Sequence, residues 1–308
     1  MISQAESPRY EPDRRSRRVI GPLFGLACLL ATLSGVVVLA ILLGSVVAAV
    51  YRSSTDGSIL STLGHLMSSL RSNNPAKAGY RVGIAGTLWL LGLVTAIAIP
   101  AGVGAAVFLE EYAPAGRLRR LIQLNIANLA GVPSIVYGLL GLAVFYRAFG
   151  FRSFAMGPTL LVGGLTLSLL ILPVIVIATQ EALRTVPLSL RQAAMALGAS
   201  RWQVVRDHVL PSALPGILTG VILALSRAIG ETAPLLMVGA VGSILSLPKG
   251  PSSRYTALPV EIYNYAKEPA VAFQGVAAGG ILLLLALLLT MNATAIIIRN
   301  RSARSSRG

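Results

Sequence analysis

The chain has 308 residues, of which 55% are hydrophobic and 12% charged, and its formal net charge is +15. Several apolar runs are long enough to cross a hydrocarbon core of roughly 30 Å, which takes about 20 helical residues, so a water-soluble protein is excluded. Basic residues at the ends of such runs normally set membrane topology and contact anionic lipid headgroups, so the positive charge does not indicate a nucleic-acid partner.

The N-terminal part of the chain is predicted to form a tail and one membrane span. Residues 1–20 are polar and basic and are expected to be a disordered cytosolic tail. The apolar run within residues 21–80 is far longer than the hydrophobic region of about 7–15 residues in a signal peptide. We therefore interpret it as a retained helix that is followed by an external loop. Its Cys28 is the single cysteine of the sequence, so no intrachain disulfide is possible.

Five more spans are predicted in residues 81–300, which makes the protein an all-α polytopic membrane protein with six transmembrane helices. A cytosolic loop at 180–211 divides this core, and residues 301–308 form a basic cytosolic tail. The predicted spans cover residues 21–50, 84–109, 121–146, 157–179, 214–243 and 273–298. Prolines within the spans predict kinked or broken helices at Pro100, Pro133, Pro173 and Pro234.

Glycines within the spans predict close packing between helices, because small residues let membrane helices approach one another. Gly275 and Gly279 are four residues apart in the last span. The third span contains a similar group of three, namely Gly131, Gly138 and Gly141.

The distribution of Lys and Arg predicts the orientation of the chain. These residues are more numerous on the side that carries both termini and the 180–211 loop than on the opposite side. The richer side of a membrane protein is normally cytoplasmic. Both termini and the 180–211 loop are therefore expected in the cytosol, and the loops at 51–83 and 244–272 outside.

The polar segment from Gln192 to Pro211 interrupts the apolar runs. Gly198 is suited to a left-handed cap at the end of a first short helix. Ser200 and Gln203 have the spacing of a capping box for a second helix, which Pro211 is expected to stop. The segment is either a docking element for another protein or a connecting loop that folds back on the membrane helices.

The sequence lacks the motifs that would indicate chemistry within the chain. A P-loop needs a glycine immediately before its lysine, and none of the three lysines, Lys77, Lys249 and Lys267, follows a glycine. The two histidines have no cysteine or carboxylate at metal-ligand spacing, and neither HExxH nor GxSxG occurs. We therefore expect no enzyme active site, no metal and no cofactor.

Arg227 and Glu231 are charged residues inside the predicted fifth span. Four residues apart, they share one face of a helix. A charge near mid-membrane costs about 2.5–3.5 kcal/mol on insertion scales and usually marks a transport pathway or a buried pair. Arg227 either offers its guanidinium to an anion while Glu231 holds it in place, or the pair only locks this helix to a neighbour.

The segment QAAMALG, followed by nine residues and HVLP, resembles the EAA loop of the permease subunits of ABC importers. The usual pattern is Glu-Ala-Ala, three residues, Gly, nine residues, Ile, one residue, Leu-Pro. Gln192 replaces the glutamate of the pattern and His208 replaces the isoleucine. The matching residues are Ala193, Ala194, Gly198, Leu210 and Pro211.

Four further stretches resemble the PstA-type permease of the phosphate importer, a member of the binding-protein-dependent transport permeases. They are FLEEYAP at 108–114, NLAGVPSIVYGLLGLAVF at 128–145, SRAIGETAPLL at 226–236 and TALPVEIYNYA at 256–266. The resemblance covers roughly residues 80–300. It does not extend to the N-terminal tail or to the loop at 51–83.

This resemblance implies a type I ABC importer permease (MetI-like) fold in the bacterial cytoplasmic membrane. The partners that it implies are a PstC-type permease, a PstB-type ATPase dimer and a PstS-type phosphate-binding protein. The ATPase would be docked through Gln192, Ala193, Ala194, Gly198, Leu210 and Pro211, and the substrate path would include Arg227 and Glu231. Alternatives are a permease for molybdate or sulfate, and a stand-alone channel or ion-coupled carrier.

Overall fold

The computed structural model describes residues 14–54, 57–147, 156–240, 244 and 246–305, and side chains between residues 22 and 301 of this set. The described chain is helical over most of its length. It divides into two units, residues 1–48 and residues 49–308.

The first unit consists of most of helix α1 (Arg14–Ser53), whose last residues belong to the second unit. From Pro22 onwards, α1 is long and apolar enough to cross a membrane. A helix that is hydrophobic all round is stable in lipid, because its backbone N–H and C=O groups bond within the helix. Residues 1–13 of the predicted tail lie outside the described residues. The prediction of disorder is wrong for residues 14–20, because α1 begins at Arg14.

The second unit is a set of long helices joined by short ones. The long helices are α3 (Arg81–Val107), α6 (Leu160–Arg184), α9 (Leu210–Gly230) and α12 (Ala272–Ser305). The shorter α-helices are α2 (Ile59–Ser68), α4 (Arg117–Ala130), α5 (Ser134–Gly141), α7 (Leu188–Ala196), α8 (Arg201–Gln203), α10 (Ala233–Met237) and α11 (Leu258–Ala266). A 3₁₀ turn, η1 (Pro75–Lys77), and three π-helical turns, η2 (Phe108–Tyr112), η3 (Leu142–Tyr146) and η6 (Val204–Val209), complete the described elements.

The predicted fold class is confirmed, with one modification to a span. Five helices in the described residues are long and apolar enough to cross a membrane, and a sixth span results if one bent pair is counted as a single span. This pair joins α4 to the helix Ser134–Tyr146 at an angle of 104°, so the predicted span at 121–146 is not one straight helix. Pro133 lies directly before the second helix of the pair, where proline disfavours helical geometry in the residue that precedes it.

The predicted fifth span, 214–243, is not one helix, and its last residues, 241–243, lie outside the described residues. One helix runs from Arg201 to Gly230. The chain is then extended at Glu231 before α10 begins, with Pro234 in its first turn. Proline is tolerated there because the first N–H groups of a helix have no intrahelical partner. By contrast, α3 continues through Pro100 and α6 through Pro173.

The expectation that Pro211 stops the second cytosolic helix is also wrong, because α9 continues past it. Proline normally breaks a helix because it has no N–H and because its ring collides with the carbonyl four residues earlier. Here the preceding turn, η6, is π-helical, and the Leu210 N–H donates to the Val205 carbonyl, five residues back. This wider turn accommodates the proline within a continuous helix.

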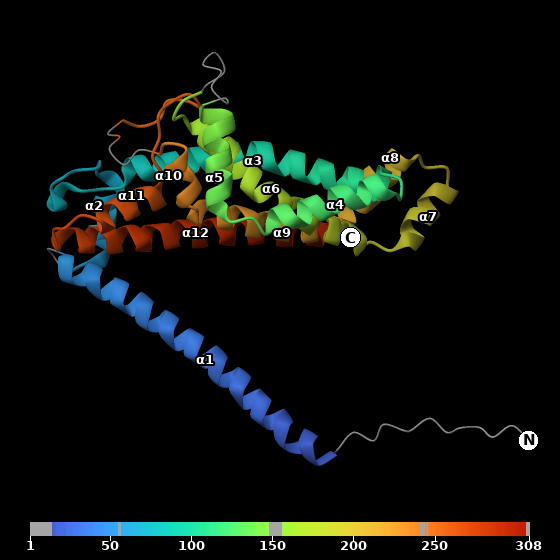
Figure 1. Ribbon diagram of the computed structural model, residues 1–308, viewed down its shortest axis with the longest axis horizontal. Helices are drawn as coiled ribbons and strands as arrows, with labels where there is room; N and C mark the ends of the chain where they lie inside the picture. The colour runs from blue at the N-terminus through green and yellow to red at the C-terminus, as the bar shows by residue number, and fades with distance from the viewer. Residues whose placement is uncertain (1–13, 55–56, 148–155, 241–243, 245, 306–308) are drawn as a thin grey trace, which may run out of the picture. The chain divides into compact units, whose positions relative to one another are not determined.

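Helix α6 is the central helix of the second unit, with α3 and α9 packed against it (Figure 1). Its most apolar stretch is 67% buried, the largest share among the five candidate spans. The approach of α9 depends on two glycines. A Cβ at Gly220 would lie 2.3 Å from the Ala178 Cβ, and a Cβ at Gly216 would lie 2.8 Å from the Ala182 Cβ. These small residues therefore set how closely the two helices pack.

The predicted glycine contacts are confirmed at four of five positions. A Cβ at Gly275 would meet Ser53, and one at Gly279 would meet Leu66. On α5, Gly138 lies against Pro234 and Gly141 against Thr166. The exception is Gly131, the C-cap of α4. A Cβ there would come near only the backbone carbonyl of Asn128, which belongs to the same helix.

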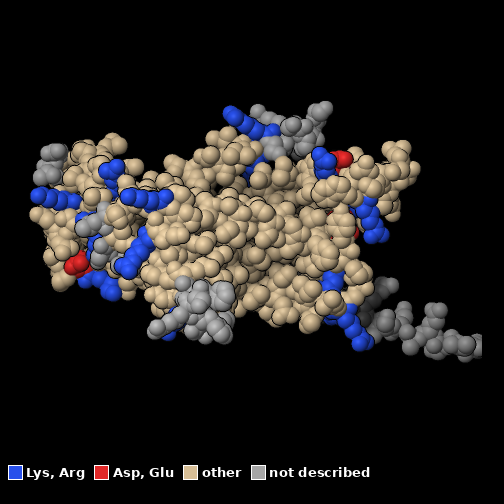
Figure 2. All heavy atoms as spheres, turned by 90° about the horizontal axis from the view of Figure 1, so that it is seen from above, with Lys and Arg blue, Asp and Glu red and all other residues tan. Residues whose placement is uncertain are grey.

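Four of the short helices of the second unit lie at opposite ends of the long ones. Figure 1 shows α7 and α8 at one end of α3, α6 and α9, and α2 and α11 at the other. In the face that Figure 2 shows, Lys and Arg gather mostly toward these ends, and much of the surface between them is uncharged. Such a charge-poor band between charged ends is typical of a protein that crosses a bilayer.

Candidate functional site

The first candidate site lies where α9 ends. Arg227 is in the last turn of the helix, and Glu231 follows in an extended conformation at its C-cap. The Arg227 Nε donates to Glu231 Oε1 at 3.3 Å, so the predicted spacing does bring the two side chains together. The positive charge of Arg227 is favourable at this position because the C-terminal end of a helix carries partial negative charge.

The register between α9 and α6 gives the depth of Arg227 within the helix bundle. Gly216 faces Ala182, and Gly220 faces Ala178, so the two helices run antiparallel. Extending this register places Arg227 at the level of Ile171, close to the middle of α6. The helix therefore ends at mid-span, and non-helical backbone at this depth is stable only inside a protein or beside water.

The two groups of the pair differ in exposure. The side chain of Arg227 is 42% exposed and that of Glu231 is 17% exposed. Arg227 shares an exposed face of α9 with Leu223 and Gly230, which lie one turn before it and one turn after it. The neighbouring Ala228 and Ile229 are buried on the opposite side. The guanidinium thus points out of this chain.

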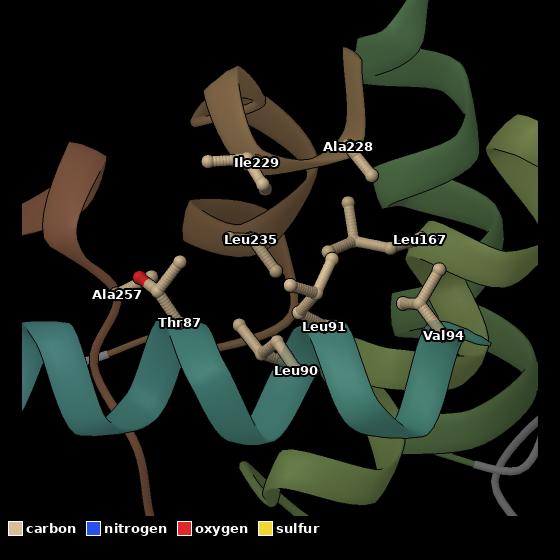
Figure 3. A pocket seen from close by; sticks show the side chains of 9 residues that line it. All are labelled: Thr87, Leu90, Leu91, Val94, Leu167, Ala228, Ile229, Leu235 and Ala257. Atoms are coloured by element: carbon tan, nitrogen blue, oxygen red, sulfur yellow. The ribbon is translucent and has the colours of Figure 1, made fainter. Parts of the chain in front are cut away.

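A small apolar cavity lies on the buried side of the same helix end (Figure 3). Its volume is about 10 Å³. A cavity needs about 10–15 Å³ to hold one water molecule, so this space is closed to any larger solute. Figure 3 shows its side chains converging from α3, α6, α9 and α10, and they belong to Thr87, Leu90, Leu91, Val94, Leu167, Ala228, Ile229, Leu235 and Ala257.

The second candidate site is the bend between α7 and α8. Gly198 has a φ of +87°, in the left-handed region that favours glycine. The Ala199 N–H donates to the Ala194 carbonyl and the Gly198 N–H to the Met195 carbonyl, which is the Schellman pattern of a helix end. The predicted capping box of Ser200 at the start of α8 is present. Both local predictions for this bend are confirmed.

The residues predicted to dock a partner do not all lie on the surface. Gln192, Ala193, Gly198 and Pro211 are exposed, and Leu210 is half-buried. Ala194, by contrast, is buried and packs in the main core, where it attaches α7 to the rest of the chain. Sequence reasoning missed the exposed apolar side chains of the same segment, which are Leu188, Met195, Leu197 and Trp202.

These exposed apolar side chains make up the outer face of the bend. Leu197 is 90% exposed, the highest value among the large hydrophobic residues that the structure describes. Neighbouring apolar side chains on a polar segment are a signature of an interaction surface. The signal was present in the sequence as leucine, methionine and tryptophan within an otherwise polar loop.

The two departures from the EAA pattern lie at the surface. Gln192 and His208 are both exposed. Glu181, eleven residues before Gln192, accepts a bond from Arg184 at 3.1 Å and has a side chain that is 67% exposed.

Comparison with a family model gives a match over most of the chain. Residues 98–303 match the model described as "Binding-protein-dependent transport system inner membrane component". The matched range contains the bend between α7 and α8 and the break at the end of α9.

Two curated relatives are similar in sequence, and one solved structure is similar in fold. A probable ABC transporter permease protein, YqgI of Bacillus subtilis, is 42% identical over 52% of this chain and 53% of its own length, so the match spans about half of that relative. The phosphate transport system permease protein PstA 1 of Mycobacterium tuberculosis is 36% identical over 72% of this chain and 70% of its own length. A chain of a bacterial alginate ABC transporter is similar in fold, with a TM-score of 0.68 at 15% identity, over 94% of this chain and 98% of that chain.

Proposed function

Because the chain belongs to the family of binding-protein-dependent transport system inner membrane components, we propose that it is the permease subunit of an ATP-driven importer of inorganic phosphate. It forms half of the path together with a second, PstC-type permease. A PstB-type ATPase dimer supplies the energy, and a PstS-type protein delivers phosphate from outside. The choice of phosphate rests on the name of the PstA 1 relative and on the SRAIGETAPLL stretch.

The observation that carries the proposal is the outward-pointing Arg227 at a mid-span helix break. Intramembrane charged residues almost always face a bundle interior or a water-filled cavity rather than lipid. The apolar cavity behind α9 is itself too small for an anion. The exposed face of Leu223, Arg227 and Gly230 therefore requires a second protein surface opposite it, and the anion passes between the two.

Arg227 and Glu231 have different roles at this path. The guanidinium is permanently charged and presents several donors in a fork that matches the oxygens of phosphate. Glu231 holds one edge of the fork through Nε and leaves the terminal nitrogens free for a ligand. Its negative charge also weakens anion binding, and this favours release. Alternation between inward-facing and outward-facing states then moves the anion across.

The bend between α7 and α8 docks the ATPase on the cytosolic side, which places both termini in the cytosol. Part of this surface is formed by exposed polar or small residues, which are Gln192, Ala193, Gly198 and Pro211. Gln192 forms a neutral hydrogen bond where the EAA pattern has a charged one, and neutral bonds are about half as strong. Leu197 adds apolar contact area.

The test is phosphate uptake by the complete four-component transporter in proteoliposomes. Arg227→Ala is expected to lower uptake by on the order of 100-fold, because the substitution removes charge-assisted hydrogen bonds to the anion. The amount of assembled complex is expected to stay unchanged. Arg120→Ala, a change at an exposed arginine of α4, serves as the control and is expected to take up phosphate normally.

Three outcomes would contradict the proposal. Normal uptake by Arg227→Ala would show that the pair only joins helices. Stronger competition by molybdate or sulfate than by unlabelled phosphate would assign another oxyanion. Uptake by the purified chain without any ATPase would indicate a channel or an ion-coupled carrier.

A further inference from the structure

A group of ion pairs joins four helices at the end of the bundle that carries α7. Glu110 and Glu111 are neighbours in η2, the π-helical turn that ends α3. Glu110 accepts bonds from Arg119 of α4 at 2.9 Å and from Arg184 of α6 at 2.7 Å. Glu111 accepts a bond from Arg191 of α7 at 2.8 Å. The two carboxylates therefore bind different helices, and sequence reasoning assigned no role to any of these residues.

Arg191 makes the most extensive contacts of the group. Its Nη2 donates both to Glu111 and to the Leu183 carbonyl at 2.9 Å, and its Nη1 donates to the Val186 carbonyl at 2.6 Å. These carbonyls lie at the C-terminal end of α6, where backbone oxygens have no intrahelical partner and attract positive charge. One side chain of α7 thus holds the ends of both α3 and α6.

This side chain is also well shielded from water. The side chain of Arg191 is 15% exposed and that of Glu111 is 11% exposed. An ion pair in such surroundings is screened by salt much less than a surface pair. Removal of either partner leaves an uncompensated charge, so the two groups are strongly held together.

Helix α7 has few other attachments to the bundle. Ala194 is its single buried residue. In the part of the chain that the structure describes, the side-chain hydrogen bonds from α7 to α3, or to the end of α6, all come from Arg191. Helix α7 also follows α6 after three residues and packs against η6. A force applied to the exposed face of α7 therefore reaches α6 through the chain itself, and it reaches α3 through the pair of Arg191 with Glu111.

We propose that Arg191, paired with Glu111, is a positioning residue that transmits the movement of the docked ATPase from α7 to α3 and α6. The inference rests on the proposed function, because it requires an ATPase bound at the bend. Arg191 itself contacts neither phosphate nor ATP. It keeps α7 in a fixed position relative to α3, so that closure of the ATPase dimer moves the membrane helices instead of bending the loop.

The test exchanges the two charges in the complete transporter, which is reconstituted in proteoliposomes and supplied with ATP. Arg191→Glu is expected to lower phosphate uptake per assembled complex at least about tenfold, while ATP hydrolysis per complex stays within about twofold. The double exchange, Arg191→Glu with Glu111→Arg, is expected to restore at least about a third of the uptake. Arg120→Glu, the same charge change at an exposed position on α4, should have no effect.

A second measurement does not depend on the substrate. Spin labels at Met195 of α7 and Phe108 of η2, both exposed, report the separation of these elements during ATP turnover, in a chain whose Cys28 has been replaced by serine. One narrow distance distribution is expected with Arg191 in place, and a broader one with Arg191→Glu. The broadening should disappear in the double exchange.

The outcomes separate the inference from the proposed function. Failure of the unmodified transporter to take up phosphate would overturn the function, and the spin-label distances would then still decide the role of Arg191. Uptake and ATP hydrolysis that fall together, in proportion to the amount of complex recovered, would overturn the inference. Failure of the double exchange to restore both coupling and the narrow distribution would also overturn it.

Discussion

At the scale of single residues, the carboxylates of Glu231 and Glu261 lie in very different surroundings. Glu231 has a guanidinium within hydrogen-bonding distance and remains partly exposed. Glu261 of α11 is fully buried, and among the described residues neither carboxylate oxygen has a hydrogen bond of good geometry, although the Gly83 backbone lies close by. It lies against Gly83, where a Cβ would come within 2.5 Å of Oε2. A buried carboxylate without partners is stable only when it is protonated.

Glu261 therefore predicts a dependence of stability on pH. Burial raises its pKa from 4.5 to about 8, although Arg71 and the Gly83 backbone lower it to a smaller extent. Between these values the folded chain binds a proton that the unfolded chain has released, so stability falls as the pH rises from about 4.5 to 8. The full change is on the order of 5 kcal/mol.

The measurement is the thermal unfolding of the detergent-solubilised chain, followed between pH 5 and pH 8.5. The unfolding temperature of the unmodified chain is expected to fall across this range. Glu261→Gln keeps the shape of the side chain and should flatten the slope, whereas Glu268→Gln, a few residues further along the chain, should keep it. An unchanged slope in Glu261→Gln would show that this carboxylate does not titrate in that range.

Sequence reasoning succeeded at residues whose geometry is set by near neighbours. The left-handed Gly198, the Ser200 capping box and the Arg227–Glu231 pair all depend on residues within about one helical turn. The pairing of Arg191 with Glu111 joins residues that are far apart in the sequence, so no local spacing could reveal it. The burial of Glu261 could not be predicted from local spacing either, because it depends on α3, which is far away in the sequence.

At the scale of helices, the contact between α9 and α6 controls where Arg227 lies. The two helices meet through Gly216 and Gly220, and these glycines hold α9 at a fixed distance from α6. Lipid gives helices no hydrophobic reason to associate, so packing at small residues carries much of the attraction. A change at this contact is therefore expected to affect both stability and the position of the arginine.

Gly220→Leu is expected to destabilise the folded chain by about 1–3 kcal/mol, the usual cost of an overpacked contact. The added side chain would overlap the Ala178 Cβ, which cannot rotate away. Resistance of the detergent-solubilised chain to protease during heating measures the change. Gly92→Leu is the matched control, because a Cβ at Gly92 of α3 meets nothing within 4 Å. Equal stability of the two variants would argue against the close contact.

The positions of helix ends were harder to predict than the existence of the helices. Four prolines within apolar runs carried the same local signal, yet two of them lie inside continuous helices and two lie at breaks. What differs is the surroundings: Pro234 packs against Gly138 of α5, whereas Pro173 is buried in a continuous α6. Tertiary packing decides whether a proline bends a helix or ends it.

At the scale of the whole second unit, the two ends of the bundle carry different elements. One end carries α7, with its exposed apolar face, and the ion pairs of η2. The other end carries α2 and α11 (Figure 1). Arg227 lies between them, at the level of the middle of α6. This arrangement suits a subunit that receives movement at one end and substrate at the other.

Cross-linking can test which end meets the ATPase. Leu197 of the bend is 90% exposed, and Leu60 of α2, at the opposite end, is 83% exposed. In a chain whose Cys28 has been replaced by serine, Leu197→Cys is expected to cross-link to the ATPase, and Leu60→Cys is not. Capture of the ATPase is read from the size of the cross-linked product. Capture through Leu60→Cys alone would reverse the proposed orientation.

The outward-facing guanidinium of Arg227 also has a consequence for how cells make this subunit. A newly inserted copy that has not met its companion presents a permanent charge to hydrocarbon, at a cost of about 2.5–3.5 kcal/mol. The group that we propose to bind the substrate therefore makes a copy without its companion less stable in the membrane. We therefore expect cells to make the two permease chains in matched amounts, or to degrade the surplus chain, because Arg227 points out of this chain.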